Sequence, residues 1–281
     1  MNISLDKPSA LKQLFQSPKP LIGTVHCEPL PGTPRYKDNP IEYVIERAIQ
    51  DAKAYVDGGM DGLIIENHGD IPFLRPEDIG HEITAVMAVI TREVAKVVKI
   101  PIGINLLAND ACGALAVAKA AGAQFIRVNQ WANAYVANEG FVQGDSAKAL
   151  RYRKQISAED VLIFADMHVK HGAHAIVADR SLSELARDVE FFDADVAIAT
   201  GNRTGDTVPD DEISGIREGT SLPIVTGSGL TAENALHILG IADGAIVGSS
   251  LKRGGVWWNP VERGQVEALV AVADELRQQP H

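Results

Sequence analysis

The sequence predicts an α/β fold made of a single (β/α)8 barrel, or TIM barrel, and three observations support this prediction. Eight apolar runs of strand length alternate with amphipathic stretches of helix length, which is typical of parallel strands joined by crossover helices. The chain has 281 residues, close to the roughly 250 residues that one such barrel occupies. The last two apolar runs each end in a glycine–serine turn before a helix, as in barrels that bind phosphate.

The elements follow in order along the chain. Residues 1–20 are expected to form an extra helix or cap, and residues 21–281 the barrel. Asn39-Pro40 should open the first barrel helix and Gly58-Gly59 should close it, while Asp110 and Gly122 should bracket the third. The predicted strands are Leu21–Val25, Gly62–Ile65, Ile102–Asn105, Gln124–Val128, Val161–Ala165, Asp195–Ala199, Leu222–Thr226 and Gly244–Val247.

Composition excludes several classes of protein. The formal net charge is -11 and no run of lysine or arginine occurs, which argues against binding to nucleic acid or to an anionic membrane. Two cysteines are too few for a disulfide framework. The first residues lack the pattern of a signal peptide, and no apolar run approaches about 18 residues. We therefore expect a cytoplasmic protein without membrane insertion.

The glycine–serine turns predict a phosphate site. Glycines let the backbone approach an oxyanion closely, and N–H groups at a helix start attract negative charge. A plain turn is the alternative, although the pair of turns at the end of a long α/β chain favours phosphate. The predicted phosphate-binding residues are Gly227, Ser228, Gly229, Gly248, Ser249 and Ser250.

Side chains alternate along a strand, and one register places polar residues inside the barrel at almost every strand end. Buried polar groups are costly unless they have partners, so a functional site is the better explanation. The lining residues are Thr24, His26, Glu66, His68, Asn105, Arg127, Asn129, Asp166, His168, Thr200 and Thr226.

Asp166 and His168 lie two residues apart, so they are expected to share a face. Such a pair could transfer protons or bind a metal, or it could only order the rim of the barrel. Lys170 would need a desolvated amine to form an imine. Because it precedes a glycine-containing turn, we expect it to face solvent or phosphate instead.

The catalytic candidates are Asp166, His168, Glu66 and His26, and the same four residues could supply ligands for a divalent metal, although no contiguous metal motif is present. Alternatively, His26 donates to a carbonyl and Glu66 pairs with Arg127. The candidates for substrate binding are Asn105, Arg127, Asn129, Lys170, Asn202 and Arg203.

Two long loops, residues 129–146 and 201–209, could close over the mouth of the barrel. Both could equally be inert surface. Trp257 and Trp258 are expected to pack under the last helix or to form a subunit contact, so a homo-oligomer is left open.

Five phrases of the sequence are specific, namely Ile22–Gly32, Asp61–Asn67, Asn105–Asp110, Phe125–Asn129 and Thr226–Gly229. Through them the chain resembles the BtpA family, also called BtpA/SgcQ, from about residue 20 to residue 276. The resemblance implies a phosphate-binding TIM barrel. It also implies a link to the accumulation of photosystem I reaction-centre proteins, from which the family takes its name, whereas other members look like products of sugar-catabolism operons.

Two functional hypotheses follow. In the first, the protein is an enzyme that acts on a small phosphorylated metabolite, such as a sugar phosphate, by acid/base chemistry as an isomerase, an epimerase or an aldolase-like lyase. In the second, it is a non-catalytic assembly or biogenesis factor. The polar lining favours the enzyme.

Overall fold

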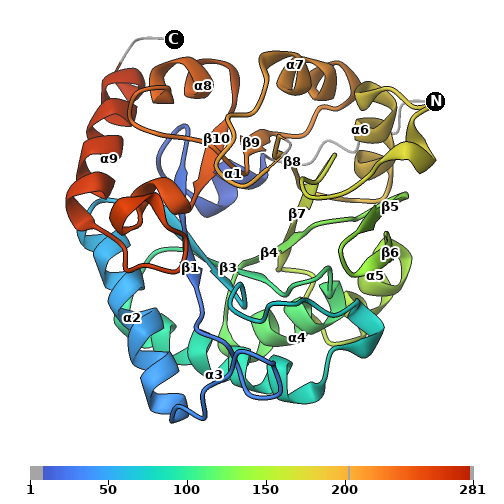
Figure 1. Ribbon diagram of the computed structural model, residues 1–281. Coiled ribbons are helices and arrows are strands. Elements are labelled where there is room, and N and C mark those ends of the chain that lie inside the picture. The colour runs from blue at the N-terminus through green and yellow to red at the C-terminus, as the bar shows by residue number, and fades with distance from the viewer. Residues whose placement is uncertain (1–8, 202, 279–281) are drawn as a thin grey trace.

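The computed structural model describes residues 9–201 and 203–278. Its centre is a closed barrel of eight parallel strands ringed by helices (Figure 1), so the predicted fold class is confirmed. The strands follow one another around the barrel in the order β1-β10-β9-β8-β7-β4-β3-β2. They are β1 (Leu21–His26), β2 (Gly62–Glu66), β3 (Ile102–Asn105), β4 (Phe125–Val128), β7 (Leu162–Asp166), β8 (Val196–Ala199), β9 (Ile224–Thr226) and β10 (Gly244–Val247).

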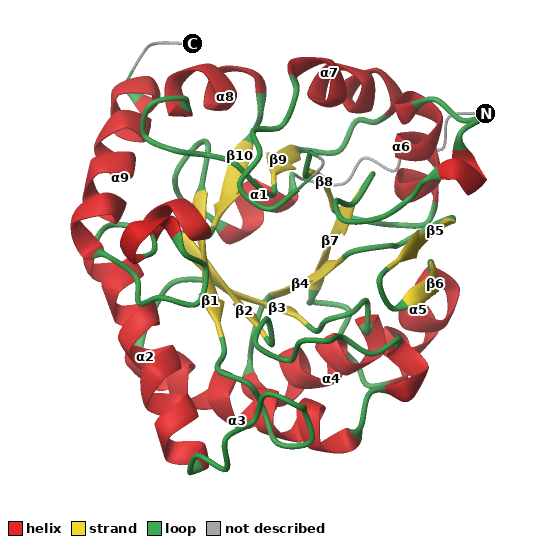
Figure 2. Cartoon of the chain, viewed as in Figure 1, coloured by secondary structure: helices red, strands yellow, loops and turns green. Residues whose placement is uncertain are grey.

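Helices alternate with these strands and form the outer layer (Figure 2). The α-helices are α1 (Ala10–Leu14), α2 (Ile41–Asp57), α3 (His81–Val97), α4 (Ala111–Ala121), α5 (Ser146–Gln155), α6 (Leu182–Phe191), α7 (Asp210–Gly219), α8 (Ala235–Ile241) and α9 (Arg263–Arg277). Short 3-10 helices are η1 (Pro76–Asp78), η2 (Ala175–Val177), η3 (Ser249–Leu251) and η4 (Arg253–Gly255). Among the described helices, none combines the length and the apolar character that crossing a membrane requires.

Local sequence explains the predicted helix borders. The carboxylate of Asp110 accepts a hydrogen bond from Gly113 N at 2.8 Å and so caps α4. Gly122 ends the same helix in the left-handed conformation, with φ 84°, which costs glycine little. Helix α2 ends where predicted, because Gly58 is its C-cap.

The interior of the barrel is filled by side chains that alternate along the strands. One apolar cluster joins residues of seven strands with Phe15, which follows α1. The rings of Phe15 and Phe125 lie 6.3 Å apart, edge to face. This packing closes the amino-terminal end of the barrel, so a ligand has access to the strands from their carboxyl ends. The cluster residues on strands are Ile22, Ile64, Phe125, Phe164, Val196, Ile198, Val225 and Ile246.

Two features differ from the sequence prediction. Val225 belongs to the interior cluster, so Thr226 does not face the interior as expected, and Gly227 takes that place. The first predicted loop, residues 129–146, contains an antiparallel hairpin of β5 (Ala134–Ala137) and β6 (Gly140–Gln143). Tyr135 and Val142 are cross-strand partners in this hairpin and are buried, and so short a pattern does not distinguish a hairpin from an irregular loop.

Candidate active site

A layer of buried charged and amide side chains lies directly above the apolar interior, at the carboxyl ends of four neighbouring strands. Glu66 pairs with Asn105 in the β2–β3 register, and Asn105 pairs with Arg127 in the β3–β4 register. Asp166 is the last residue of the next strand, β7. All four are 6% exposed or less. Strand alternation therefore brings these predicted site residues together.

Arg127 lies between the two carboxylates. Its Nη1 is 3.5 Å from Glu66 Oε1, and its Nη2 and Nε are 3.2 and 3.3 Å from Asp166 Oδ1 and Oδ2. The alternative pairing of Glu66 with Arg127 is therefore present, and Arg127 bridges both acids. A bidentate guanidinium of this kind fixes carboxylate geometry as well as neutralising charge.

The two carboxylates differ in electrostatics. Burial alone would raise the pKa of Glu66, but the close approach of His68 and the charge of Arg127 outweigh it and lower this pKa. Burial raises the pKa of Asp166 despite the charge of Arg127 beside it. Neighbouring acids with opposite shifts are a feature of proton-transfer sites.

Two buried amide oxygens near these acids have no hydrogen-bond partner within the described part of the chain. They are Asn105 Oδ1 and Asn129 Oδ1. The amide nitrogens are engaged, since Asn105 Nδ2 lies 3.4 Å from Glu66 Oε1 and Asn129 Nδ2 lies 3.0 Å from Asp166 Oδ2. Unpaired buried acceptors are costly, and the hydroxyl groups of a substrate would satisfy them.

Lys170 was expected to face solvent or phosphate, and of these two it lies beside the predicted phosphate turn. The residue is half-buried, and its Nζ donates to Gly227 O at 3.2 Å. Desolvation, together with the charge of Arg127, lowers the pKa of Lys170 to about 8. No carboxylate among the described residues lies within ion-pair distance of it. The amine therefore has the desolvated character that nucleophilic and general-base lysines require.

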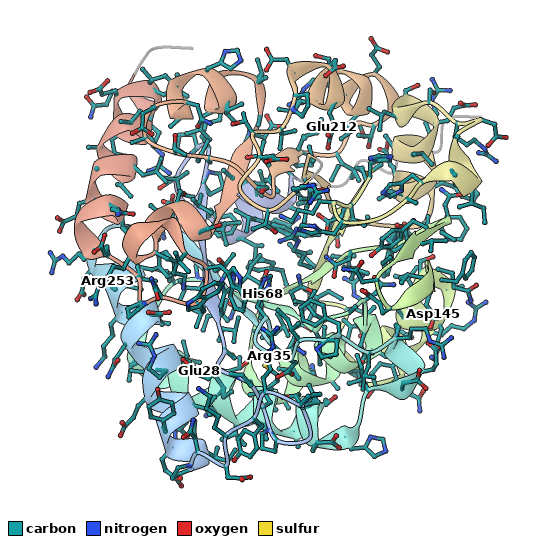
Figure 3. The ribbon with its side chains drawn as sticks, viewed as in Figure 1. Glu28, Arg35, His68, Asp145, Glu212 and Arg253 are labelled. Atoms are coloured by element: carbon teal, nitrogen blue, oxygen red, sulfur yellow. The ribbon has the colours of Figure 1, made fainter. Side chains whose placement is uncertain are left out.

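His26 and Glu66 lie side by side in the β1–β2 register, and His68 follows two residues later. His26 Nε2 is 3.6 Å from Glu66 Oε2, and His68 Nδ1 is 3.7 Å from the same oxygen. The two imidazole rings stack with centroids 4.5 Å apart. Figure 3 labels His68 near the middle of the view along the barrel. The atoms could hold a metal ion.

Burial lowers the pKa of His26 well below its ordinary value, and the charges of His68 and Lys252 act in the same direction, which favours the neutral imidazole. Its Nδ1 bonds to Trp257 O at 2.9 Å. The alternative in which His26 donates a hydrogen bond to a carbonyl oxygen is therefore observed. This hydrogen bond leaves Nε2 of His26 facing Glu66. Trp257 contacts both histidine rings, a role that sequence reasoning did not assign.

His168 does not form the expected pair with Asp166. Its ring stacks on His174 at 3.7 Å, and no described hydrogen bond or ion pair joins it to Asp166. Burial lowers the pKa of His168 to about 4. It lines a cavity of about 440 Å³ with residues of α6 and α7, including Leu185 and Glu212. Strand β7 ends at Asp166, so the alternation on which the prediction depended does not reach residue 168.

The two glycine–serine turns lie at the ends of β9 and β10. Backbone N–H groups of five residues have no acceptor within the described part of the chain, namely Ser228, Gly229, Leu230, Ser249 and Ser250. The last two open η3, where first-turn N–H groups have no partner inside the helix. A Cβ on Gly227 would lie 3.2 Å from Arg127 Nη2, so the first turn adjoins the buried charges.

Some serine hydroxyls form hydrogen bonds that hold the turns in place. Ser228 Oγ accepts from Gly205 N at 3.0 Å, and Ser250 Oγ donates to Leu230 O at 2.7 Å. Arg203 is exposed and contributes its carbonyl to this loop, 3.4 Å from Ser228 Oγ. Asn202 lies outside the described residues.

A buried ion pair that sequence reasoning missed supports the second turn. Lys252 is 0% exposed and donates to Asp51 Oδ2 at 3.0 Å, while Asp51 Oδ1 accepts from Val261 N at 3.0 Å. The pair joins the end of η3 to α2. The partners are 201 residues apart, and no local sequence signal links them.

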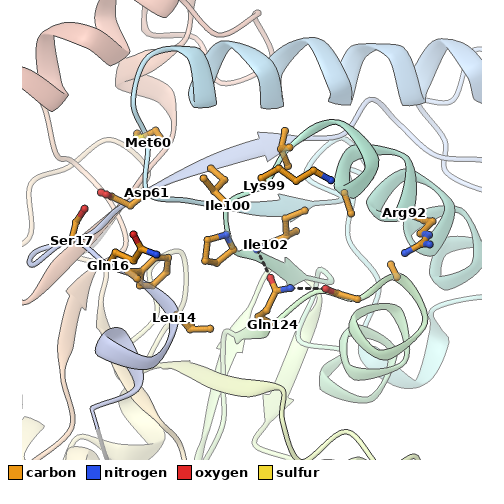
Figure 4. A pocket seen from close by; sticks show the side chains of 16 residues that line it. Leu14, Gln16, Ser17, Met60, Asp61, Arg92, Lys99, Ile100, Ile102 and Gln124 are labelled. Carbon is orange, nitrogen blue, oxygen red and sulfur yellow. Dashed lines mark hydrogen bonds between the residues drawn. The ribbon is translucent and has the colours of Figure 1, made fainter.

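A second cavity, of about 700 Å³, lies at the opposite, amino-terminal end of the barrel between α1 and the starts of β2 to β4 (Figure 4). There Gln124 accepts a hydrogen bond from Ile102 N at 2.8 Å. Conserved chemistry in barrels lies at the carboxyl ends of the strands, and the buried charges described above lie there too. We therefore assign the candidate active site to the carboxyl end.

Comparison with known proteins identifies the family of the chain. The sequence profile of the BtpA family matches residues 17–275. A protein of Archaeoglobus fulgidus is 42% identical over 255 residues, which are 91% of this chain and 98% of that protein. Photosystem I biogenesis protein BtpA of Synechocystis is 37% identical over 274 residues, covering 96% and 93% of the two chains.

Solved structures share the fold. N-(5'-phosphoribosyl)anthranilate isomerase from Pyrococcus furiosus aligns with TM-score 0.57 and 13% identity over 92% of this chain and 99% of that one. Thiamine phosphate pyrophosphorylase from Pyrococcus furiosus aligns with TM-score 0.53 and 16% identity over 92% and 96%. At these identities the likeness concerns the architecture.

Proposed function

The chain belongs to the BtpA family, and we propose that it is an enzyme that acts on a small phosphorylated metabolite, such as a sugar phosphate, by proton transfer next to a carbonyl group. The observation that carries the proposal is the buried layer of Glu66, Arg127, Asp166 and Lys170 beside the turn at Gly227. Isomerisation and epimerisation begin with such a transfer, and aldol-type cleavage ends with its reverse, the protonation of the carbon next to the carbonyl.

The phosphate is bound by the free backbone N–H groups of the two turns. Residues 228–230 contribute three of them, and Ser249 and Ser250 contribute two at the start of η3. Oriented N–H groups at a helix start bind anions through their partial positive charge. Lys170 adds a cation when it is protonated, and this local field allows a chain of net charge -11 to attract an anion.

The hydroxyl groups of the substrate donate to the unpaired oxygens of Asn105 and Asn129. Neutral Lys170 removes a proton from the carbon next to the carbonyl, and the electron pair moves onto the carbonyl oxygen. In an isomerisation the ammonium of Lys170 then returns a proton to the former carbonyl carbon. The Asp166 carboxylate takes the proton of the hydroxyl group on the deprotonated carbon and passes it to the enediolate oxygen, and the Arg127 guanidinium stabilises the negative intermediate. The pKa of Lys170, lowered to about 8, provides a fraction of neutral amine near neutral pH, and the raised pKa of Asp166 makes its carboxylate a better proton acceptor.

The test uses the purified protein in D₂O with a panel of aldose and ketose phosphates, followed by NMR. We expect deuterium to enter the carbon next to the carbonyl of at least one sugar phosphate, and we expect no exchange with the same sugar lacking phosphate. Asp166→Asn should lower exchange by at least about 10²-fold. Equal exchange with and without the phosphate group would contradict the phosphate site.

The second candidate function is that of an assembly factor, which the name of the Synechocystis relative favours. A protein with this role need not exchange substrate protons. If no sugar phosphate raises the melting temperature and none exchanges, the assembly role becomes the better explanation, because any ligand that binds the folded state stabilises it by mass action.

A further inference from the structure

We propose that His26, Glu66 and His68 form a binding site for one divalent transition-metal ion at the mouth of the barrel. The ligand atoms are His26 Nε2, Glu66 Oε2 and His68 Nδ1, which all lie within 4.8 Å of one another. Metal binding does not depend on the proton-transfer reaction proposed above, and it can be measured without any substrate.

The distances fit a cation between the three atoms. Each nitrogen lies 3.6 or 3.7 Å from Glu66 Oε2, which is beyond hydrogen-bond length. Ligands about 2.1 Å from a metal are separated by about 3.0 Å in octahedral and about 3.4 Å in tetrahedral geometry. The two nitrogens lie within 4.8 Å of each other, and side-chain rotations that shorten these separations would bring all three atoms to coordination distance.

The protein leaves one of these atoms without any other partner. His68 Nδ1 is inaccessible to solvent and has no hydrogen-bond partner within the described residues. A buried polar atom of this kind calls for an explanation. Two imidazole nitrogens that converge on a single carboxylate oxygen are explained by a shared cation.

The surrounding residues hold the ligands in position. The hydrogen bond from His26 Nδ1 to Trp257 O fixes the tautomer whose Nε2 lone pair faces Glu66. Arg127 and Asn105 contact Glu66 Oε1, at 3.5 and 3.4 Å, which leaves Oε2 for the metal. Outer contacts of this type orient metal ligands in known sites.

The ligand set indicates the kind of metal. Two imidazoles and one carboxylate suit zinc, iron, manganese or cobalt rather than calcium or magnesium. Three protein ligands leave coordination positions for water or substrate, which is typical of catalytic sites. A Cβ on Gly248 would lie 3.6 Å from the His26 ring, so the ion would lie beside the second glycine–serine turn.

The test is a titration of chelator-treated protein with Co²⁺, followed by visible absorption and isothermal calorimetry, and elemental analysis after dialysis against Zn²⁺. We expect one ion per chain. His68→Gln should weaken binding by at least about 10-fold, the range found for perturbed metal shells, and His26→Gln should do the same.

The matched control is His237→Gln. His237 is exposed and its Nε2 lies 2.9 Å from Asp210 Oδ1, so it is a histidine–carboxylate pair with no third ligand among the described residues. This variant should bind metal like the unchanged protein. Binding that survives His68→Gln, or a stoichiometry well below one, would overturn the site. Because no sugar phosphate is present, neither result depends on the proposed reaction. Circular dichroism and the melting temperature check that each variant is folded.

Discussion

Replacement of Arg127 by Met tests whether this guanidinium holds the buried acids together. Its side chain is 6% exposed and contacts Glu66 and Asp166, which are equally buried. Removal of one partner from a buried ion pair costs about 3–5 kcal/mol. For a domain of this size about 2 °C of melting temperature corresponds to 1 kcal/mol, so we expect a loss of about 6–10 °C at pH 7.

The loss should depend on pH, and its sign follows from linkage. Without Arg127, burial raises the folded-state pKa of Asp166 further above its unfolded value near about 4, whereas Glu66 keeps His68 beside it. The folded state then binds more protons than the unfolded state, so the free energy of unfolding falls as pH rises from about 4 towards the raised pKa. Each such proton changes stability by about 1.4 kcal/mol per pH unit. Between pH 5 and 7 the difference in the free energy of unfolding between the unchanged protein and Arg127→Met should grow by up to about 3 kcal/mol for one carboxylate. This difference is the stability deficit of the variant.

The assay is urea unfolding of both proteins at pH 5, 6 and 7. Arg217→Met is the control, because Arg217 forms a half-exposed pair with Asp243 at 2.9 Å, and such pairs contribute about 0–1 kcal/mol. Arg127→Lys keeps one charge but cannot bridge both acids, so its deficit should be intermediate. A deficit for Arg127→Met that is below 1 kcal/mol, or independent of pH, would refute the reasoning.

Further predictions concern Lys170, the glycine–serine turns, the buried Asp51–Lys252 ion pair and His168. Lys170 should be labelled by a phosphorylated aldehyde and borohydride at a rate that rises through about pH 8, because only the neutral amine reacts, and Lys170→Met should abolish the labelling seen by mass spectrometry. Gly229→Ala forces a side chain into φ 71° at a strain of about 1–3 kcal/mol and should weaken phosphate binding about 10-fold in calorimetry. Asp51→Ala should cost about 3–5 kcal/mol in thermal unfolding, and addition of Lys252→Met should recover part of it. His168→Asn should leave phosphate affinity unchanged, because its ring lies outside the charged layer.

These experiments have matched controls and clear negative outcomes. Gly240→Ala adds a methyl group to open space in α8 and should not change phosphate affinity. Labelling that is independent of pH would contradict the desolvated state of the lysine. A double variant of Asp51 and Lys252 as unstable as the single one would mean that the two charges do not interact. A large loss of phosphate affinity in His168→Asn would return this histidine to the binding site.

Much of the candidate site was predictable because the rule that places its side chains, their alternation along a strand, is local. The alternation of side chains along a strand needs only neighbouring residues, and it correctly placed Glu66, Asn105 and Arg127 on one side. The same rule failed for His168, because the strand ends at Asp166 and the chain bends. It also gave the wrong register for Thr226, where a strand of three residues offers too little pattern.

The sequence by itself determined the barrel, the order of its elements and the two glycine–serine turns, since apolar periodicity and glycine positions act over a few residues. Only the tertiary structure decided which polar groups meet. The desolvation of Lys170 depends on Gly227 from another strand end, the convergence of His26 and His68 depends on the β1–β2 pairing, and the partner of Lys252 lies on a helix near the other end of the chain. Burial and electrostatic coupling depend on distance in space, and barrel closure sets those distances between segments that share no local sequence pattern.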